Sequence, residues 1–161
     1  MLSPGCRDDA VAAATPAAYD GVCLLADKDV TSNNVGVDTN LVLAVEASKS
    51  YMVRARLMTG RISGTAGTRI GITGPAGAAI EGYLLTSGNG LTNIIAHRVS
   101  LFQLDPSLVM NTNPAQVDFW ARIQIGVTAG DIRLQLSGVN GTDVIRMYAG
   151  SAMEIEEITE V

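Results

Sequence analysis

Aromatic and charged side chains are scarce in this sequence. Aromatic residues make up 4% of the 161 residues and charged residues 17%, against about 25% charged residues in an average soluble domain. Because 47% of the residues are nonetheless hydrophobic, we expect an aliphatic core built from Val, Ile, Leu and Ala. A surface so poor in charge indicates that neighbouring protein subunits cover much of it.

Basic residues are also few, with 11 Lys and Arg against 16 Asp and Glu and a net charge of −5. A sequence-independent nucleic-acid binder needs a basic face, and so does a protein that binds anionic membranes. We therefore expect neither nucleic acid nor a membrane as a partner, and no apolar run approaches the roughly 20 residues of a membrane span. The first residues lack the basic and apolar regions of a secretory signal, so we expect the protein to be made and assembled in a cytoplasm.

Cysteine and histidine are nearly absent, since the sequence holds only Cys6, Cys23 and His97. These residues are too few for a zinc site of four Cys and His ligands. In a reducing compartment we expect free thiols, with Cys6 in a mobile arm and Cys23 as a small buried hydrophobe, while a disulfide between them stays open. His97 lies in a predicted strand without a nearby cysteine or triad partner, so we expect a structural histidine rather than a general base.

No motif predicts catalysis. Glycoside hydrolysis needs two carboxylates at a cleft, but the candidates lie beside turns or on polar strand faces, where we expect them to be solvated. The acidic C-terminal segment could bind a hard cation, but we favour a solvated edge or a salt-bridge partner for a neighbour. Residues 71–77 lack the Lys and the following helix of a phosphate-binding loop. We therefore expect no enzyme, no metal and no cofactor. The candidate carboxylates are Glu81, Asp105, Asp118 and Asp131, and the acidic segment holds Glu154, Glu156, Glu157 and Glu160.

A helical period is missing throughout, and short strand patterns separated by turns take its place. A parallel α/β fold is excluded for lack of crossover helices. We predict an all-β fold, an antiparallel jelly-roll β-sandwich over residues 21–161, preceded by an extended N-terminal arm over residues 1–20. The Asn140-Gly141 pair predicts a hairpin, and the sequence predicts loops over residues 59–67 and 105–116. The predicted strands cover residues 22–25, 41–45, 51–58, 69–73, 79–86, 94–102, 117–127, 132–137, 144–148 and 152–158.

Two of these strands divide into an aliphatic face and a face of unusual composition. Residues 51–58 and 117–127 alternate with the period of two that marks a half-buried strand, and Val127 is expected on the aliphatic side. The opposite sides carry Trp, Arg and Met, which are enriched in protein interfaces. We expect a subunit interface there, with coverage of Trp120 by residues 105–116 of the same chain as the alternative. The candidate interface residues are Met52, Arg54, Arg56, Met58, Trp120 and Arg122.

From Thr39 to the C-terminus, the order of these patterns resembles a jelly-roll module of bacteriophage virion proteins, found on tails, fibres and heads. The resemblance covers about three quarters of the chain and leaves out the arm and residues 105–116. It implies virion assembly and transfers no catalytic residue. It is carried by the alternating strand 50–57, the Gly-rich strand and turn 68–78, the strand–turn–strand segment 119–136 and the closing segment 149–158.

The sequence and the resemblance together predict a structural protein of the virion, assembled in the host cytoplasm. The favoured role is a capsid decoration or cement subunit that binds the assembled shell and stabilises it. Expected partners are further copies of itself, with a trimer preferred, and a major capsid protein or another virion protein. Two of the arginines are expected to pair with the acidic C-terminal strand of an adjacent copy. The alternative is a tail- or fibre-tip module that binds host surface glycans, which the scarcity of aromatic residues disfavours.

Overall fold

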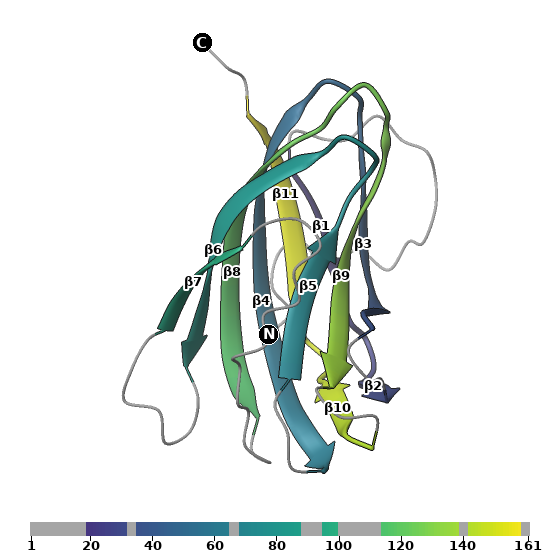
Figure 1. The fold of residues 1–161 in the computed structure, drawn as a ribbon, viewed down its shortest axis with the longest axis vertical. Helices are drawn as coiled ribbons and strands as arrows, with labels where there is room; N and C mark the ends of the chain where they lie inside the picture. The colour runs from purple at the N-terminus through teal and green to yellow at the C-terminus, as the bar shows by residue number, and fades with distance from the viewer. Residues whose placement is uncertain are drawn as a thin grey trace.

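The computed structural model describes residues 19–31, 35–64, 68–87, 95–99, 114–138 and 142–158, with side chains described for all of these except 19, 83–87 and 95–99. Over these residues the chain forms strands and no helix (Figure 1). The strands are β1 (Tyr19–Cys23), β2 (Lys28–Thr31), β3 (Val37–Val45), β4 (Ser50–Ser63), β5 (Thr68–Thr73), β6 (Ala79–Ser87), β7 (Ile95–Val99), β8 (Ala115–Gln124), β9 (Gly130–Gly138), β10 (Val144–Met147) and β11 (Ala152–Ile158).

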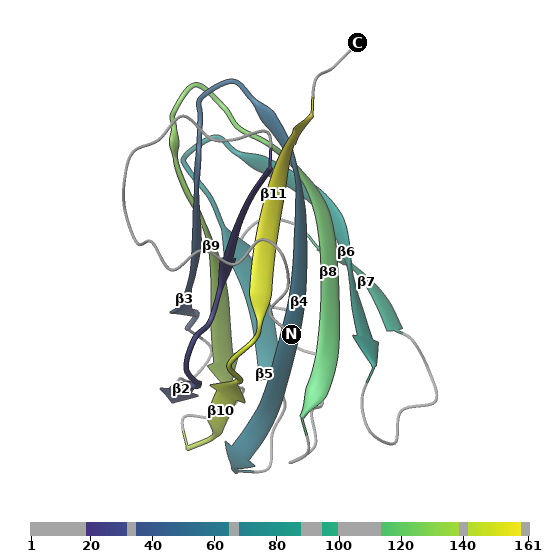
Figure 2. The same ribbon diagram turned by 180° about the vertical axis from the view of Figure 1, so that it is seen from behind.

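The strands form two antiparallel sheets that face each other, as Figures 1 and 2 show from opposite sides. The large sheet has the order β1–β11–β4–β8–β6–β7, and β10 joins it by pairing with both β2 and β4. The small sheet has the order β3–β9–β5. The predicted all-β antiparallel sandwich is therefore confirmed.

The chain alternates between the small and the large sheet from β3 to β6 and again from β8 to β10, while β6, β7 and β8 follow one another in the large sheet. This alternation is what a jelly roll requires. However, β6 and β7 extend the large sheet beyond β8 instead of widening the small sheet. The jelly roll itself stays an interpretation. The predicted hairpin at Asn140-Gly141 is wrong, because β9 and β10, on either side of it, belong to different sheets.

Strand β4 is the longest strand and runs past the point where the sequence predicts a loop. Its first half pairs with β11, and its second half pairs with β10, where Thr59 lies opposite Met147 and Gly60 opposite Arg146. A Cβ at Gly60 would lie 3.1 Å from the hydroxyl oxygen of Tyr148. The missing side chain thus leaves room for Tyr148, and pairing with β10 outweighs the weak strand preference of glycine. The loop predicted from residue 59 begins only after Ser63.

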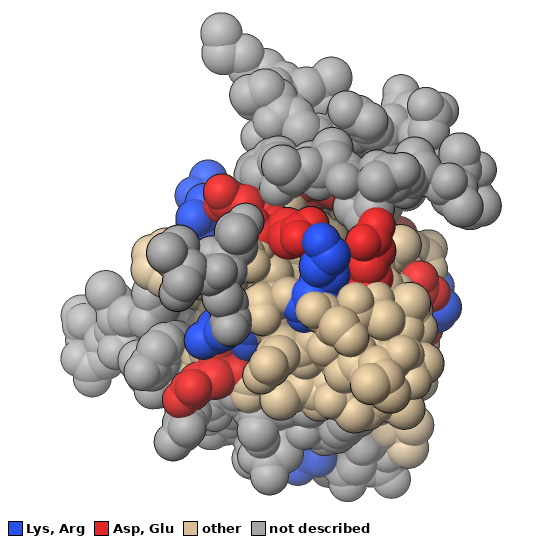
Figure 3. All heavy atoms as spheres, turned by 90° about the horizontal axis from the view of Figure 1, so that it is seen from above, with Lys and Arg blue, Asp and Glu red and all other residues tan. Residues whose placement is uncertain are grey.

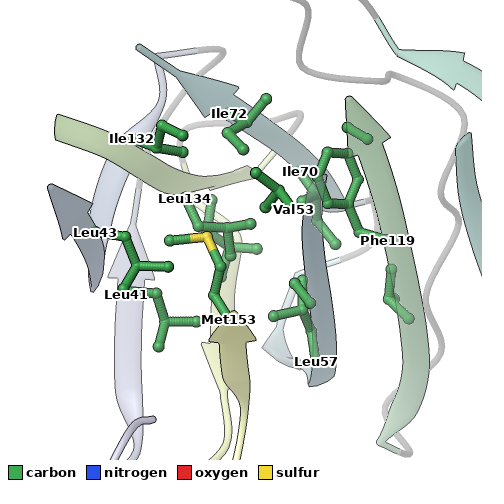
Figure 4. Packing of buried hydrophobic residues seen from close by; sticks show 14 of the residues in the cluster. Leu41, Leu43, Val53, Leu57, Ile70, Ile72, Phe119, Ile132, Leu134 and Met153 are labelled. Carbon is green, nitrogen blue, oxygen red and sulfur yellow. The ribbon is translucent and has the colours of Figure 1, made fainter. Parts of the chain in front are cut away.

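The core lies between the sheets and is aliphatic, as predicted (Figure 4). Phe119 and Tyr51 are the large aromatic residues in it. Tyr51 is 1% exposed, its hydroxyl oxygen accepts a hydrogen bond from the backbone N–H of Glu46 at 3.0 Å, and burial raises its pKa. Figure 4 shows side chains from both sheets meeting in this layer, among them Leu41, Leu43, Val53, Leu57, Ile70, Ile72, Ile132, Leu134 and Met153.

Val127 is placed wrongly by the sequence pattern. Strand β8 ends at Gln124, and Val127 lies in the turn to β9 with 90% of its surface exposed. The alternation continues only as far as Ile125, which is 2% exposed. Figure 3 looks onto this end of the sandwich, where a broad area carries no Lys, Arg, Asp or Glu. Several exposed residues of this end are small or uncharged: Ala76, Gly77, Val127, Thr128 and Ala129.

The N-terminal region differs from the prediction in three ways. Tyr19 and Asp20, assigned to the arm, begin strand β1, while the rest of the arm lies outside the described residues. The short strand β2 was not expected from the sequence. Cys23 is disulfide-bonded and half-buried, so the expectation of a free, buried thiol is wrong.

Of the predicted loop 105–116, residues 115 and 116 begin strand β8, and residues 105–113 lie outside the described part. Of the predicted strand 94–102, the described part is β7. In the described ranges no helix is long and apolar enough to cross a bilayer.

Candidate protein interface

The six candidate interface residues lie together on one surface. In β4 and β8 the buried positions alternate with more exposed ones, and the exposed set faces away from the small sheet. We call this side of the large sheet the outer face. The sequence predicts two similar strand faces but not their relation, and the structure makes them neighbours because β4 pairs directly with β8. The paired outer-face positions are Met52 with Arg122, Arg54 with Trp120, Arg56 with Asp118, and Met58 with Gln116.

Large apolar side chains are exposed on the outer face. Trp120 is 56% exposed although it lies in the middle of β8, and Met58 is 44% exposed. Met52 is half-buried. Ile62, further along β4, is also 44% exposed. The register of β4 on β10 shifts between Arg61 and Ser63, so the period of two does not assign Ile62 to the outer face.

The arginines of the outer face make ion pairs within the chain. Arg54 lies 3.8 Å from Glu156 on β11, and both side chains are 54% exposed. Arg56 lies 3.4 Å from Asp118, and its own side chain is 77% exposed. The sequence analysis expects arginines to meet the acidic strand of another copy, yet β11 is the direct neighbour of β4 in the same sheet. Exposed pairs of this kind contribute about 0–1 kcal/mol to stability, so they leave the arginines able to bind elsewhere.

One row of residues crosses four strands of the outer face. Gly21 on β1 pairs with Glu154 on β11, Glu154 with Arg54 on β4, and Arg54 with Trp120 on β8. Val22 packs against the core, so its neighbour Gly21 lies on the outer side of β1. Across the sheet, the row therefore consists of a glycine without a side chain, an acidic residue, a basic residue and a large aromatic residue.

Coverage of Trp120 by the preceding loop is not tested, because residues 105–113 lie outside the described residues. Among the described residues Trp120 keeps more than half of its surface. The interface itself likewise stays a prediction.

Two clusters of ion pairs and hydrogen bonds join strands at the edges of the sheets. Arg146 on β10 donates two hydrogen bonds to Asp29 on β2, at 2.6 Å and 2.7 Å, and lies 3.3 Å from Asp27. These hydrogen bonds lower the pKa of Asp29 and raise that of Arg146. In the small sheet, Gln135 and Arg133 donate to Asp38 on β3, and the bond from Gln135 is the main cause of its lowered pKa. Both clusters join neighbouring strands, which is a structural role.

The candidate catalytic carboxylates are not brought together. Asp118 lies on the outer face, Glu81 lies on β6 opposite Arg122, and Asp131 accepts a hydrogen bond from Arg133 in the small sheet. Asp105 and Glu160, and the side chain of His97 in β7, lie outside the described part. Among the residues with described side chains, no group of three or more His, Cys, Asp or Glu could hold a metal ion.

The described fold and the outer face define an antiparallel β-sandwich with a Trp-, Met- and Arg-bearing sheet surface. No protein-family model and no curated protein matches the chain. Among solved structures, one of the infectious bursal disease virus Gx strain is 12% identical over 86% of this chain and 39% of that chain, with a TM-score of 0.24. The crystal structure of the infectious bursal disease virus VP2 subviral particle is 12% identical over 88% of this chain and 37% of that chain, with a TM-score of 0.19.

This chain therefore spans about two fifths of the length of those viral proteins. With TM-scores this low, the likeness carries no argument about function.

Proposed function

We propose that this chain is a structural subunit of a virus particle that works by binding other protein subunits through its outer face. The observation that carries the proposal is Trp120, which is 56% exposed in the middle of a strand, with Arg54 directly opposite it on β4 and Met52 two positions away along that strand. Tryptophan and arginine supply much of the binding energy in protein interfaces, and methionine adapts to the surface that it meets.

The more specific role that we propose is a bacteriophage capsid decoration or cement subunit. The strand-and-turn order from Thr39 onward supports the virion assignment, and a sandwich with an exposed Trp-, Arg- and Met-bearing face suits a protein that attaches to a shell built by another protein. A subunit that binds the assembled lattice and not free shell subunits shifts the assembly equilibrium towards the shell. Its partners are then a major capsid protein, or another virion protein, and further copies of itself.

Binding of the purified chain to shells that lack it tests this proposal. We expect the chain to sediment with the shells and to raise their resistance to heat, and Trp120→Ala to weaken the binding by roughly thirtyfold or more, as expected for a hot spot of about 2 kcal/mol. Val127→Ala is the matched control, because Val127 is another exposed hydrophobic residue but lies at the end of the sandwich. Equal binding of Trp120→Ala and the unaltered protein would contradict the role of the outer face.

The alternative role, a fibre-tip module that binds glycans, rests on the same exposed ring, since aromatic rings stack on sugars. A glycan array distinguishes the two roles. We expect no glycan to be bound. A glycan whose binding is lost in Trp120→Ala would replace the cement role by the fibre-tip role.

A further inference from the structure

The row Gly21–Glu154–Arg54–Trp120 is complementary to the same row in reversed order. When its order is reversed, each member meets its complement: the acid meets the base, and the tryptophan meets the glycine. A two-fold interface requires a surface that complements itself in this way, because the same patch occurs on both subunits. The outer face carries such a row across four hydrogen-bonded strands.

We infer that the partner of the outer face is a second copy of this chain, docked face to face about a two-fold axis that runs along the strands between β11 and β4. This inference rests on the proposed role of the outer face in binding protein. The rotation places Glu154 opposite Arg54 of the second copy and Arg54 opposite its Glu154. It also places Trp120 over Gly21 of the second copy, a residue that has no side chain of its own.

The neighbouring rows tolerate the same arrangement. In the row beside it, Glu156 faces Met52 of the second copy, and on the other side Ala152 faces Arg56. Arg122, on β8, faces position 19 of β1, which is a tyrosine, and Asp118 faces the disulfide-bonded Cys23. No like charges are therefore placed opposite each other in the three central rows. Because sheet twist turns two packed faces by about 30°, the central row contributes most to the match.

The charge pattern of the outer face favours a second copy of the chain over a partner whose surface is wholly acidic or wholly basic. An acidic partner would meet Glu154 and Glu156 on β11, and a basic partner would meet Arg54 and Arg56 on β4. Acid and base stand in adjacent columns about 5 Å apart, so the partner needs the same two columns in reversed order. A second copy supplies them, with a two-fold symmetry in place of the trimer preferred from the sequence, which stays untested.

Charge reversal at two positions tests the pairing in the full chain. Arg54→Glu places acid opposite Glu154 of the second copy, and Glu154→Arg places base opposite Arg54, twice in each dimer because of the symmetry. We expect each variant alone to raise the dimer dissociation constant at least tenfold in sedimentation equilibrium. An equimolar mixture of the two variants restores both pairs, and we expect it to form a mixed dimer with near-original affinity. The double variant should dimerise with itself for the same reason.

Asp131→Arg is the control for the charge change, since it makes the same acid-to-base change in the small sheet, away from the outer face, where Asp131 accepts a hydrogen bond from Arg133. We expect it to leave the dissociation constant within about twofold. Gly21→Leu, which fills the space opposite Trp120, should weaken the dimer as Trp120→Ala does. Circular dichroism establishes that each variant is folded before its mass is measured.

A chain that is monomeric at all concentrations, or a mixture of Arg54→Glu and Glu154→Arg that fails to associate, overturns this inference. Neither outcome affects the proposed function if the chain still binds shells through Trp120. In the converse outcome, the mixture forms dimers while Trp120→Ala binds shells as tightly as the unaltered protein. This result would support the two-fold pairing and contradict the shell-binding role of the outer face. A dimer that Val127→Glu disrupts and the charge reversals do not would move the contact to the end of the sandwich.

Discussion

Phe119 and Trp120 are neighbours in the chain, yet 2% of the first and 56% of the second is exposed. The alternation of β8 places them on opposite sides of the large sheet. Phe119 packs among aliphatic side chains of both sheets (Figure 4), whereas Trp120 contributes its ring to the outer face. Of the two neighbouring aromatic residues, Phe119 therefore belongs to the core and Trp120 to the proposed binding surface.

We predict that Phe119→Ala lowers the free energy of unfolding by about 3–5 kcal/mol, because it leaves a cavity in a close-packed core. Trp120→Ala should lower it by about 1 kcal/mol or less. Urea denaturation of the two variants, at a concentration where the chain is monomeric, measures both values. A large loss of stability in Trp120→Ala would show that the ring is covered by its own chain.

The bond between Asp29 and Arg146 predicts a dependence of stability on pH. The pKa of Asp29 is lowered from 3.8 by hydrogen bonds from Arg146, so the carboxylate stabilises the folded state above the pKa of the unfolded chain. This contribution is lost as the pH falls below about 4 and through the lower pKa of the folded state. We predict that Asp29→Asn costs about 1 kcal/mol or less at pH 7, because the pair is partly exposed.

Urea denaturation at pH 7 and near pH 2.5 tests this dependence. The difference between Asp29→Asn and the unaltered protein should shrink as the pH falls through the lowered pKa of Asp29, because the folded protein then loses this charge. A difference that stays constant between the two pH values would assign the effect to packing instead of the ion pair.

At the scale of the strands, the contact of β6 with β8 depends on a glycine. Gly82 pairs with Ala121, and a Cβ at Gly82 would overlap the carbonyl oxygen of Trp120 and the Cβ of Ala121. We predict that Gly82→Ala separates β6 from β8 and speeds hydrogen exchange of the β8 amides that bond to β6. Gly77→Ala is the control: Gly77 has a φ of 80° and no atom within 4 Å of the added Cβ, so it should cost about 1 kcal/mol without selective exchange in β8.

The strands that the sequence predicts well are those with a clean period of two. Residues 152–158 and 69–73 are matched closely by β11 and β5 because their pattern is local and their ends carry turn residues. Strand β4 extends past its prediction because its last residues owe their conformation to β10, more than 80 positions away in the sequence. Such pairing is a tertiary effect that local propensity does not encode.

The difference between local pattern and long-range pairing also explains which features of the candidate site the sequence predicts. Composition and alternation identify Trp120 and Arg54 as outward-facing residues on two strands. Their adjacency follows from the register of β4 on β8, and the intrachain contact of Arg54 with Glu156 follows from the position of β11 beside β4. The sequence of one strand does not predict how it pairs with another strand. The sequence alone therefore does not predict that these residues form one outer face, or that they lie in one row across it.

At the scale of the whole molecule, strand β11 holds the large sheet together. It lies between β1 and β4, and Met153 and Ile155 are 0% and 2% exposed. We predict that a chain ending at Ser151 has no cooperative thermal transition, because removing β11 leaves both neighbours without a partner along this part of the sheet and opens the core. A chain ending at Ile158, which keeps all of β11, is the control and should melt as the full chain does. A cooperative transition in the shorter chain would contradict this role.

The pairing of Tyr19–Cys23 with Ala152–Ile158 joins the beginning of the described chain to its end. During synthesis β1 therefore has no paired strand until residues 152–158 have left the ribosome, and closing so long a loop is slow. The nascent chain carries unpaired strand edges for that whole interval, which exposes it to association with other nascent chains. Premature termination should then yield insoluble fragments more readily than partly active ones, and the rate of translation should influence the yield of native protein.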